Sequence, residues 1–99
     1  MNEILPIGSI IYLKEGQQKV MILSRGCQLQ QDNELVIFGY SGAAYPVGLN
    51  PEQIFYSNQE GIDKVVFHGY TDLDEERFVE LYIKWFEENK ANLKIGKTH

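Results

Sequence analysis

Three short segments carry apolar side chains at nearly every position, and this pattern limits the folds open to the chain. Residues 10–13 read IIYL, residues 20–23 read VMIL and residues 35–38 read LVIF. Successive side chains of a β-strand point to opposite faces, so each segment would place apolar groups on both faces of a sheet. Both surfaces of that sheet need cover, unless one of them is left for a partner.

Turn-forming residues divide the chain into short segments rich in β-branched and aromatic residues, as is typical of strands. Five strands are expected, at residues 9–14, 19–25, 34–40, 54–56 and 64–68. The short polar connection between the first two predicts a hairpin. Residues 26–33 and 41–53 are interpreted as loops, because polar residues, Gly and Pro interrupt the pattern there.

A helical repeat of apolar residues follows the strands and predicts one amphipathic helix over residues 72–89. Asp72 and Glu75 have the spacing of a capping box at its start. The side chains expected to dock the helix on the sheet are Phe78, Leu81, Tyr82, Trp85 and Phe86. A single helix covers only one face of a sheet, so the second face must curl inward or remain open.

These elements predict an α+β fold with one C-terminal amphipathic helix. The sheet is expected to be a strongly bent antiparallel sheet or a small SH3-like barrel of four or five strands. A chain of 99 residues supports one core. We therefore expect a single domain over residues 1–99, with its core at about residues 5–90 and a flexible tail at residues 91–99.

The charge balance is acidic, with 14 Asp and Glu against 9 Lys and Arg and a net charge of −5. This balance disfavours nucleic acid, including an SH3-like nucleic-acid module, and it disfavours anionic membranes, because both are bound through Lys and Arg. A basic partner is favoured instead. Without a signal peptide, a membrane-length apolar stretch or a second cysteine beside Cys27, the sequence predicts a cytoplasmic protein.

No motif for catalysis, metal binding or nucleotide binding is present. Cys27, His68 and His99 are the only cysteine and histidine residues, and their spacing matches no zinc site. The acidic residues gather on the helix, where capping and solubility explain them. We expect no cofactor and no catalytic site; a small enzyme using Cys27 or His68 is the alternative.

The segment at residues 39–48 combines two tyrosines with Gly and Pro residues. Exposed tyrosine beside small residues suits protein recognition, because its ring offers rigid contact area with a polar tip. The candidate partner-binding residues are Tyr40, Tyr45, Pro46 and Val47. The alternative is that Tyr40 and Tyr45 pack against the end of the sheet and the glycines only form turns.

Three stretches together resemble a family of short uncharacterised Firmicutes proteins: LPIGSIIYLKEG at residues 5–16, YPVGL at residues 45–49 and VVFHGYTD at residues 65–72. Members of this family, a domain of unknown function, are often encoded beside the LXG toxins of the Gram-positive type VII secretion system. The resemblance implies an accessory role and transfers no catalytic residue.

Residues and resemblance together predict a non-catalytic protein-binding accessory domain. The resemblance implies a cytoplasmic chaperone or targeting adaptor for a type VII-secreted LXG toxin. The alternative is an immunity protein that neutralises a neighbouring toxin. The expected partner is another protein, and the uncovered sheet face is also compatible with a homo-oligomer.

Overall fold

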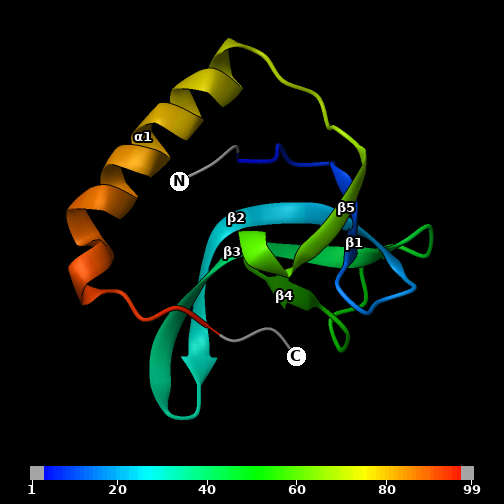
Figure 1. Cartoon of the computed structure of the whole chain (residues 1–99), viewed down its shortest axis with the longest axis horizontal. Coiled ribbons are helices and arrows are strands. Elements are labelled where there is room, and N and C mark those ends of the chain that lie inside the picture. Colours follow the sequence, from blue (N-terminus) through cyan, green and yellow to red (C-terminus); the bar gives the residue numbers. More distant parts are fainter. Residues whose placement is uncertain (1–3, 97–99) are drawn as a thin grey trace.

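The computed structural model of the protein describes residues 4–96. Along the chain, five strands and a short 3-10 helix come first, and the α-helix and a second 3-10 helix follow (Figure 1). Its elements are β1 (Ile10–Leu13), β2 (Lys19–Gln31), β3 (Glu34–Tyr45), β4 (Phe55–Ser57), the 3-10 helix η1 (Gln59–Gly61), β5 (Ile62–Phe67), α1 (Leu73–Asn89) and the 3-10 helix η2 (Lys90–Asn92). The predicted α+β class is confirmed.

The five strands form one antiparallel sheet in the order β4-β3-β2-β1-β5. The sheet is open, with β4 and β5 at its two edges, and it is strongly bent along β2 (Figure 1). Gly26 lies in β2 with a φ of 64°, a left-handed conformation that favours glycine. The bent open sheet, rather than a closed barrel, is therefore the form that the chain adopts.

The predicted pairing of the first two strands is confirmed, but β2 and β3 form a second, longer hairpin that the sequence analysis did not predict. Residues 26–33 and 41–45 were interpreted as loop, but both belong to the paired strands, apart from a two-residue turn at Asp32 and Asn33. Both turn residues have positive φ, 53° and 66°, as a type I′ hairpin turn requires. The loop prediction was wrong because the exposed Gln28 and Gln30 alternate with less exposed residues, which is a strand pattern.

The core lies on the side of the sheet that faces α1. Its buried members are Ile4, Leu5, Ile11, Val20, Ile22 and Tyr40. The N-terminal segment runs between the helix and the sheet, which places Ile4 and Leu5 under the helix (Figure 1). Partly buried residues of the strands pack around these core residues: Leu13, Phe55, Ile62 and Val65.

Helix α1 begins after Asp72, as predicted, and the Asp72 side chain accepts a hydrogen bond from the Glu75 backbone N–H at 3.0 Å. Two of the predicted docking residues, Tyr82 and Phe86, do lie between the helix and the sheet, but the rest of the docking face differs from the prediction. Val79, Tyr82 and Ile83 pack against the core, whereas Phe78 and Trp85 are each 38% exposed and Leu81 is 54% exposed. The apolar stripe is broader than one docking face, so the core covers one side of it and leaves the other exposed.

The segment after α1 returns to the sheet. The Ile37 N–H donates to the Lys94 carbonyl at 2.8 Å, the Gly96 N–H donates to the Ile37 carbonyl at 2.9 Å, and Ile95 forms a parallel bridge with Ile37. Residues 94–96 are thus bonded to β3, in contrast to the flexible tail expected at residues 91–99. Residues 97–99, including His99, lie outside the described part.

Candidate functional site

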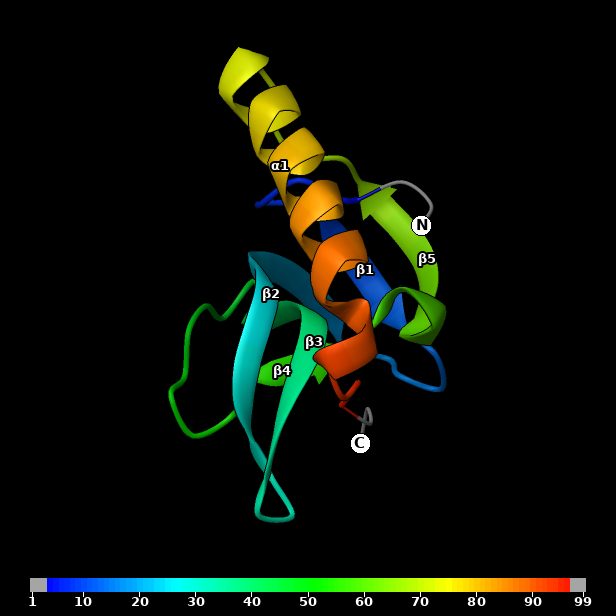
Figure 2. The same ribbon diagram turned by 90° about the vertical axis from the view of Figure 1, so that its left-hand side faces the viewer.

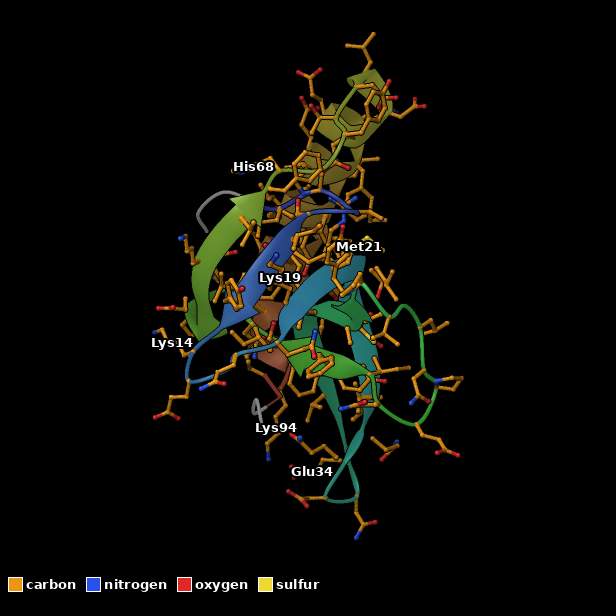
Figure 3. The ribbon with its side chains drawn as sticks, turned by 90° about the vertical axis from the view of Figure 1, so that its right-hand side faces the viewer. Lys14, Lys19, Met21, Glu34, His68 and Lys94 are labelled. Atoms are coloured by element: carbon orange, nitrogen blue, oxygen red, sulfur yellow. The ribbon has the colours of Figure 1, made fainter. Side chains whose placement is uncertain are left out.

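The side of the sheet turned away from α1 carries two cross-strand rows of side chains (Figure 3). In one row Met21 pairs with Ala43 and Ile10, and Ile10 pairs with Phe67. Directly paired residues share a face of a sheet. This row is apolar from β3 to β5: Ala43 is buried, Met21 and Ile10 are half-buried and Phe67 is exposed, and no other element of residues 4–96 covers Met21 in Figure 3.

The second row adds aromatic rings and positive charge. Tyr12 pairs with Lys19 on one side and with Lys64 on the other, and Lys19 pairs with Tyr45. The Lys19 ammonium nitrogen lies 6.0 Å from the centre of the Tyr45 ring, within cation–π range. We call the solvent-accessible residues of the two rows the outer face; without the buried Ala43, it consists of Ile10, Tyr12, Lys19, Met21, Tyr45, Lys64 and Phe67.

The loop that follows β3 extends the outer face. Tyr45 and Pro46 are exposed, Val47 is 83% exposed and Leu49 is exposed as well. The Gln18 side-chain amide donates to the Tyr45 carbonyl at 2.8 Å, and the Gly48 N–H donates to the Ala44 carbonyl at 2.7 Å. These bonds hold the base of the loop, which places the exposed Val47 and Leu49 within four residues of Tyr45 in the outer face.

Tyr40 does not join the other candidate residues. It is 4% exposed and lies in the core on the side of the sheet that faces the helix. Its hydroxyl accepts from the Leu5 N–H at 3.1 Å and donates to the Gln59 Oε1 at 2.7 Å. The expectation that Tyr40 is a surface residue was wrong, because it occupies an inward position of β3, whereas Tyr45, five residues later, points outward.

A buried ion pair fastens the first turn of α1 to the bend of β2. Arg25 donates to both carboxylate oxygens of Glu75, at 2.6 and 2.8 Å, and also to the Leu5 carbonyl at 3.2 Å. Its guanidinium lies 4.3 Å from the centre of the Phe78 ring. The Arg25 Nε is buried and has no hydrogen-bond partner among the described residues. Sequence reasoning missed this pair, since 50 residues separate its members.

Tyr82 lies at the centre of the helix–sheet contact. A Cβ at Gly26 would come within 2.8 Å of the Tyr82 ring, so the glycine makes room for the helix as well as for the bend. Burial raises the pKa of Tyr82 above its ordinary value, and the nearby Tyr40 acts in the same direction. The Tyr82 hydroxyl therefore stays protonated at neutral pH.

A pocket of about 270 Å³ opens between α1 and the sheet. Ile4, Ile37, Phe86 and Ile95 form most of its apolar wall. Asn58, one of its polar lining residues, is bonded within the fold: its side chain accepts from the Gly39 N–H at 2.8 Å and donates to the Gly96 carbonyl at 2.9 Å. These bonds tie this wall of the pocket to β3 and to the segment that follows α1.

The residues considered for catalysis lie apart from one another. Cys27 is half-buried in β2 opposite Phe38, and burial raises the pKa of its thiol. A raised pKa keeps the thiol protonated at neutral pH, which disfavours a nucleophile. His68 is exposed just after β5. Within residues 4–96, no cluster of three or more His, Cys, Asp and Glu side chains is placed to hold a metal ion.

No helix within residues 4–96 is both long enough and apolar enough to cross a membrane.

Comparison with known proteins identifies one family and no individual relative. No curated protein and no solved structure shows a significant match to the chain. The family described as a domain of unknown function, DUF4176, matches residues 4–78, which comprise the N-terminal segment, the whole sheet and the first turns of α1. Because this match covers most of the 99 residues, the chain belongs to the DUF4176 family.

Proposed function

We propose that this chain is a non-catalytic protein-binding domain and that its docking surface is the outer face together with the loop at residues 45–49. The observation that carries the proposal is the row of Met21, Ile10 and Phe67, which crosses the sheet on the side that α1 leaves uncovered. Apolar side chains that stay in contact with water on an open sheet face are unfavourable in free energy, and a bound partner would remove them from water.

The chemistry of the outer face supports a particular kind of partner. Tyr12 and Tyr45 offer aromatic rings, and Lys19 and Lys64 stand on either side of Tyr12. A partner segment with apolar side chains and carboxylates would complement both properties. This differs from the basic partner suggested by net charge, because none of the residues of the outer face is acidic, whereas α1 alone carries six of the 14 Asp and Glu residues.

The proposed biological role is that of a cytoplasmic chaperone or targeting adaptor for an LXG toxin of the type VII secretion system. It is supported by the resemblance of residues 5–16, 45–49 and 65–72 to proteins encoded beside such toxins. A chaperone would stabilise the toxin or aid its export, whereas an immunity protein would bind and inhibit the toxic domain.

The test is co-expression with the separate domains of an LXG toxin encoded beside the gene, followed by co-purification. An adaptor is expected to retain the non-toxic region, and retention of the toxic domain with loss of toxicity would instead indicate an immunity protein. Tyr45→Ala should weaken the complex about fivefold or more, as loss of an energetically important interface residue does.

Tyr70→Ala is the matched control, because Tyr70 is also exposed but lies between β5 and α1, outside the outer face. Equal affinities of the two variants would exclude the loop as a major contact. Failure of every toxin domain to co-purify would exclude the toxin-adaptor role.

A further inference from the structure

The exposed side of α1 carries a second apolar surface with a different chemistry. Phe78, Leu81 and Trp85 follow one another at intervals of three and four residues and remain 38%, 54% and 38% exposed. Figure 2 views this side of the molecule, where α1 lies in front of the sheet. We call these three residues the helix ridge.

The core holds the aromatic members of the helix ridge in place from behind. The Phe78 and Tyr82 rings are stacked with centroids 5.7 Å apart, and the Tyr82 and Trp85 rings are stacked at 6.3 Å. Phe78 also contacts the buried Arg25 guanidinium. The ridge is therefore a fixed surface, and little side-chain freedom would be lost when a partner binds to it.

Both ends of the helix ridge are acidic. Asp74 precedes Phe78 by four residues, and Glu88 follows Trp85 by three. With these two carboxylates included, the spacing between successive residues of the stripe alternates between four and three along its whole length. This spacing is typical of the residues that one helix places in its contact with a second helix running alongside it. Neither carboxylate forms an ion pair within residues 4–96.

The charges argue against a second copy of the chain on this surface. An antiparallel pairing centred on Leu81 would place Asp74 of one copy opposite Glu88 of the other at both ends. A parallel pairing would place each carboxylate opposite its own counterpart. Like charges that face each other along a helix pair are destabilising, so self-association through the ridge is disfavoured.

We propose that the helix ridge docks an amphipathic α-helix of a partner protein, with basic side chains at the two positions that face Asp74 and Glu88. Those positions are two heptads apart on the partner, a distance of about 21 Å along a helix. Its apolar seam would cover Phe78, Leu81 and Trp85. This surface lies on the opposite side of the sheet from the outer face, and the proposal does not depend on the outer face.

The probe is a synthetic helical peptide of about 20 residues, long enough to cover the whole stripe at the rise of an α-helix. It carries leucines at alternating intervals of three and four residues and lysines two heptads apart at the ends of the seam. A second peptide has glutamate in place of those lysines. Neither contains tryptophan, so the emission of Trp85, the single tryptophan of the chain, reports binding.

The lysine peptide should shift Trp85 emission and bind at least about tenfold more tightly than the glutamate peptide, with the difference shrinking at high salt. The double variant Asp74→Lys with Glu88→Lys should reverse this preference. Leu81→Lys should abolish binding of the lysine peptide. Leu73→Lys is the matched control, since Leu73 is an exposed leucine of the same helix outside the ridge, and it should leave binding unchanged.

Equal binding of the two peptides, or no binding of either, would overturn the proposal. Equal effects of Leu81→Lys and Leu73→Lys would overturn it as well. Sedimentation showing a dimer that Leu81→Lys dissociates would assign the ridge to a second copy instead. Tyr45→Ala should not change peptide binding, so failure of the outer face and failure of the ridge remain distinguishable.

Discussion

The two sides of the sheet are built from the same strands but differ in what covers them. Ile22 and Met21 are neighbours in β2: Ile22 is 1% exposed beneath α1, whereas Met21 is half-buried on the open outer face. Strand alternation supplies apolar residues to both sides. The apolar residues of the inner side are buried when the chain folds, which accounts for their presence. The apolar residues of the outer side remain partly exposed after folding, so their presence needs another explanation.

The first prediction tests this difference with two substitutions in adjacent positions. Ile22→Ala should lower the free energy of unfolding by about 4 kcal/mol, because it removes methyl groups from a sealed core. Met21→Ala should cost about 1 kcal/mol or less, since its side chain is already in contact with water. Urea unfolding of both variants measures the two losses, and similar losses would mean that the two sides do not differ.

The second prediction concerns the polar anchor of the inner side. Glu75→Gln should cost about 3 kcal/mol, because it leaves the Arg25 guanidinium buried without its ionic partner. Glu76→Gln is the control: Glu76 is in the same first turn of α1 but is exposed. Both changes remove one carboxylate near the helix N-terminus, so the difference between their unfolding energies isolates the pair with Arg25. A difference near zero would show that the pair does not anchor the helix.

The third prediction sharpens the distinction between the covered and open sides of α1. Trp85→Ala should cost about 1–2 kcal/mol, less than the 3–5 kcal/mol or so typical of a fully buried Trp, because the side chain is 38% exposed. The unfolding midpoint in urea measures this loss. A loss as large as that of Ile22→Ala would place Trp85 in the core and remove it from the helix ridge.

The smallest effect is expected at Cys27. Cys27→Ser should change stability by less than about 1 kcal/mol, because the residue is only partly buried. Burial raises the thiol pKa, so the reactive thiolate forms only at a pH above the range usual for cysteine. Alkylation by iodoacetamide should be slow at neutral pH and accelerate as the pH rises. Rapid alkylation at neutral pH would indicate a lowered pKa and revive the enzyme alternative.

The sequence predicts those parts of the fold that depend on local patterns. The helix start at Asp72 follows from capping chemistry, and the apolar period fixes the extent of α1. Apolar residues on both sides of three strands indicate a sheet that one helix cannot cover. These features are local, and the α+β class follows from them.

The parts that were missed depend on contacts between distant residues. Gln28 and Gln30 look like loop residues alone, but pairing with β3 makes them the exposed side of a strand. Tyr40 and Tyr45 look alike in sequence, and only strand register assigns one to the core and the other to the surface. The pairing of Lys19 and Lys64 around Tyr12 likewise requires the order of strands in the sheet.

The most direct test of the outer face follows the methyl group of Met21 in the unmodified protein. The chain has two methionines, so methyl labelling of methionine gives two NMR signals, and Met21→Leu identifies the one from Met21. The signals are compared before and after addition of any toxin domain that the proposed co-purification identifies as a partner. Docking on the outer face predicts that the Met21 signal shifts or broadens as the complex forms. A complex that forms while the Met21 signal stays unchanged would contradict it.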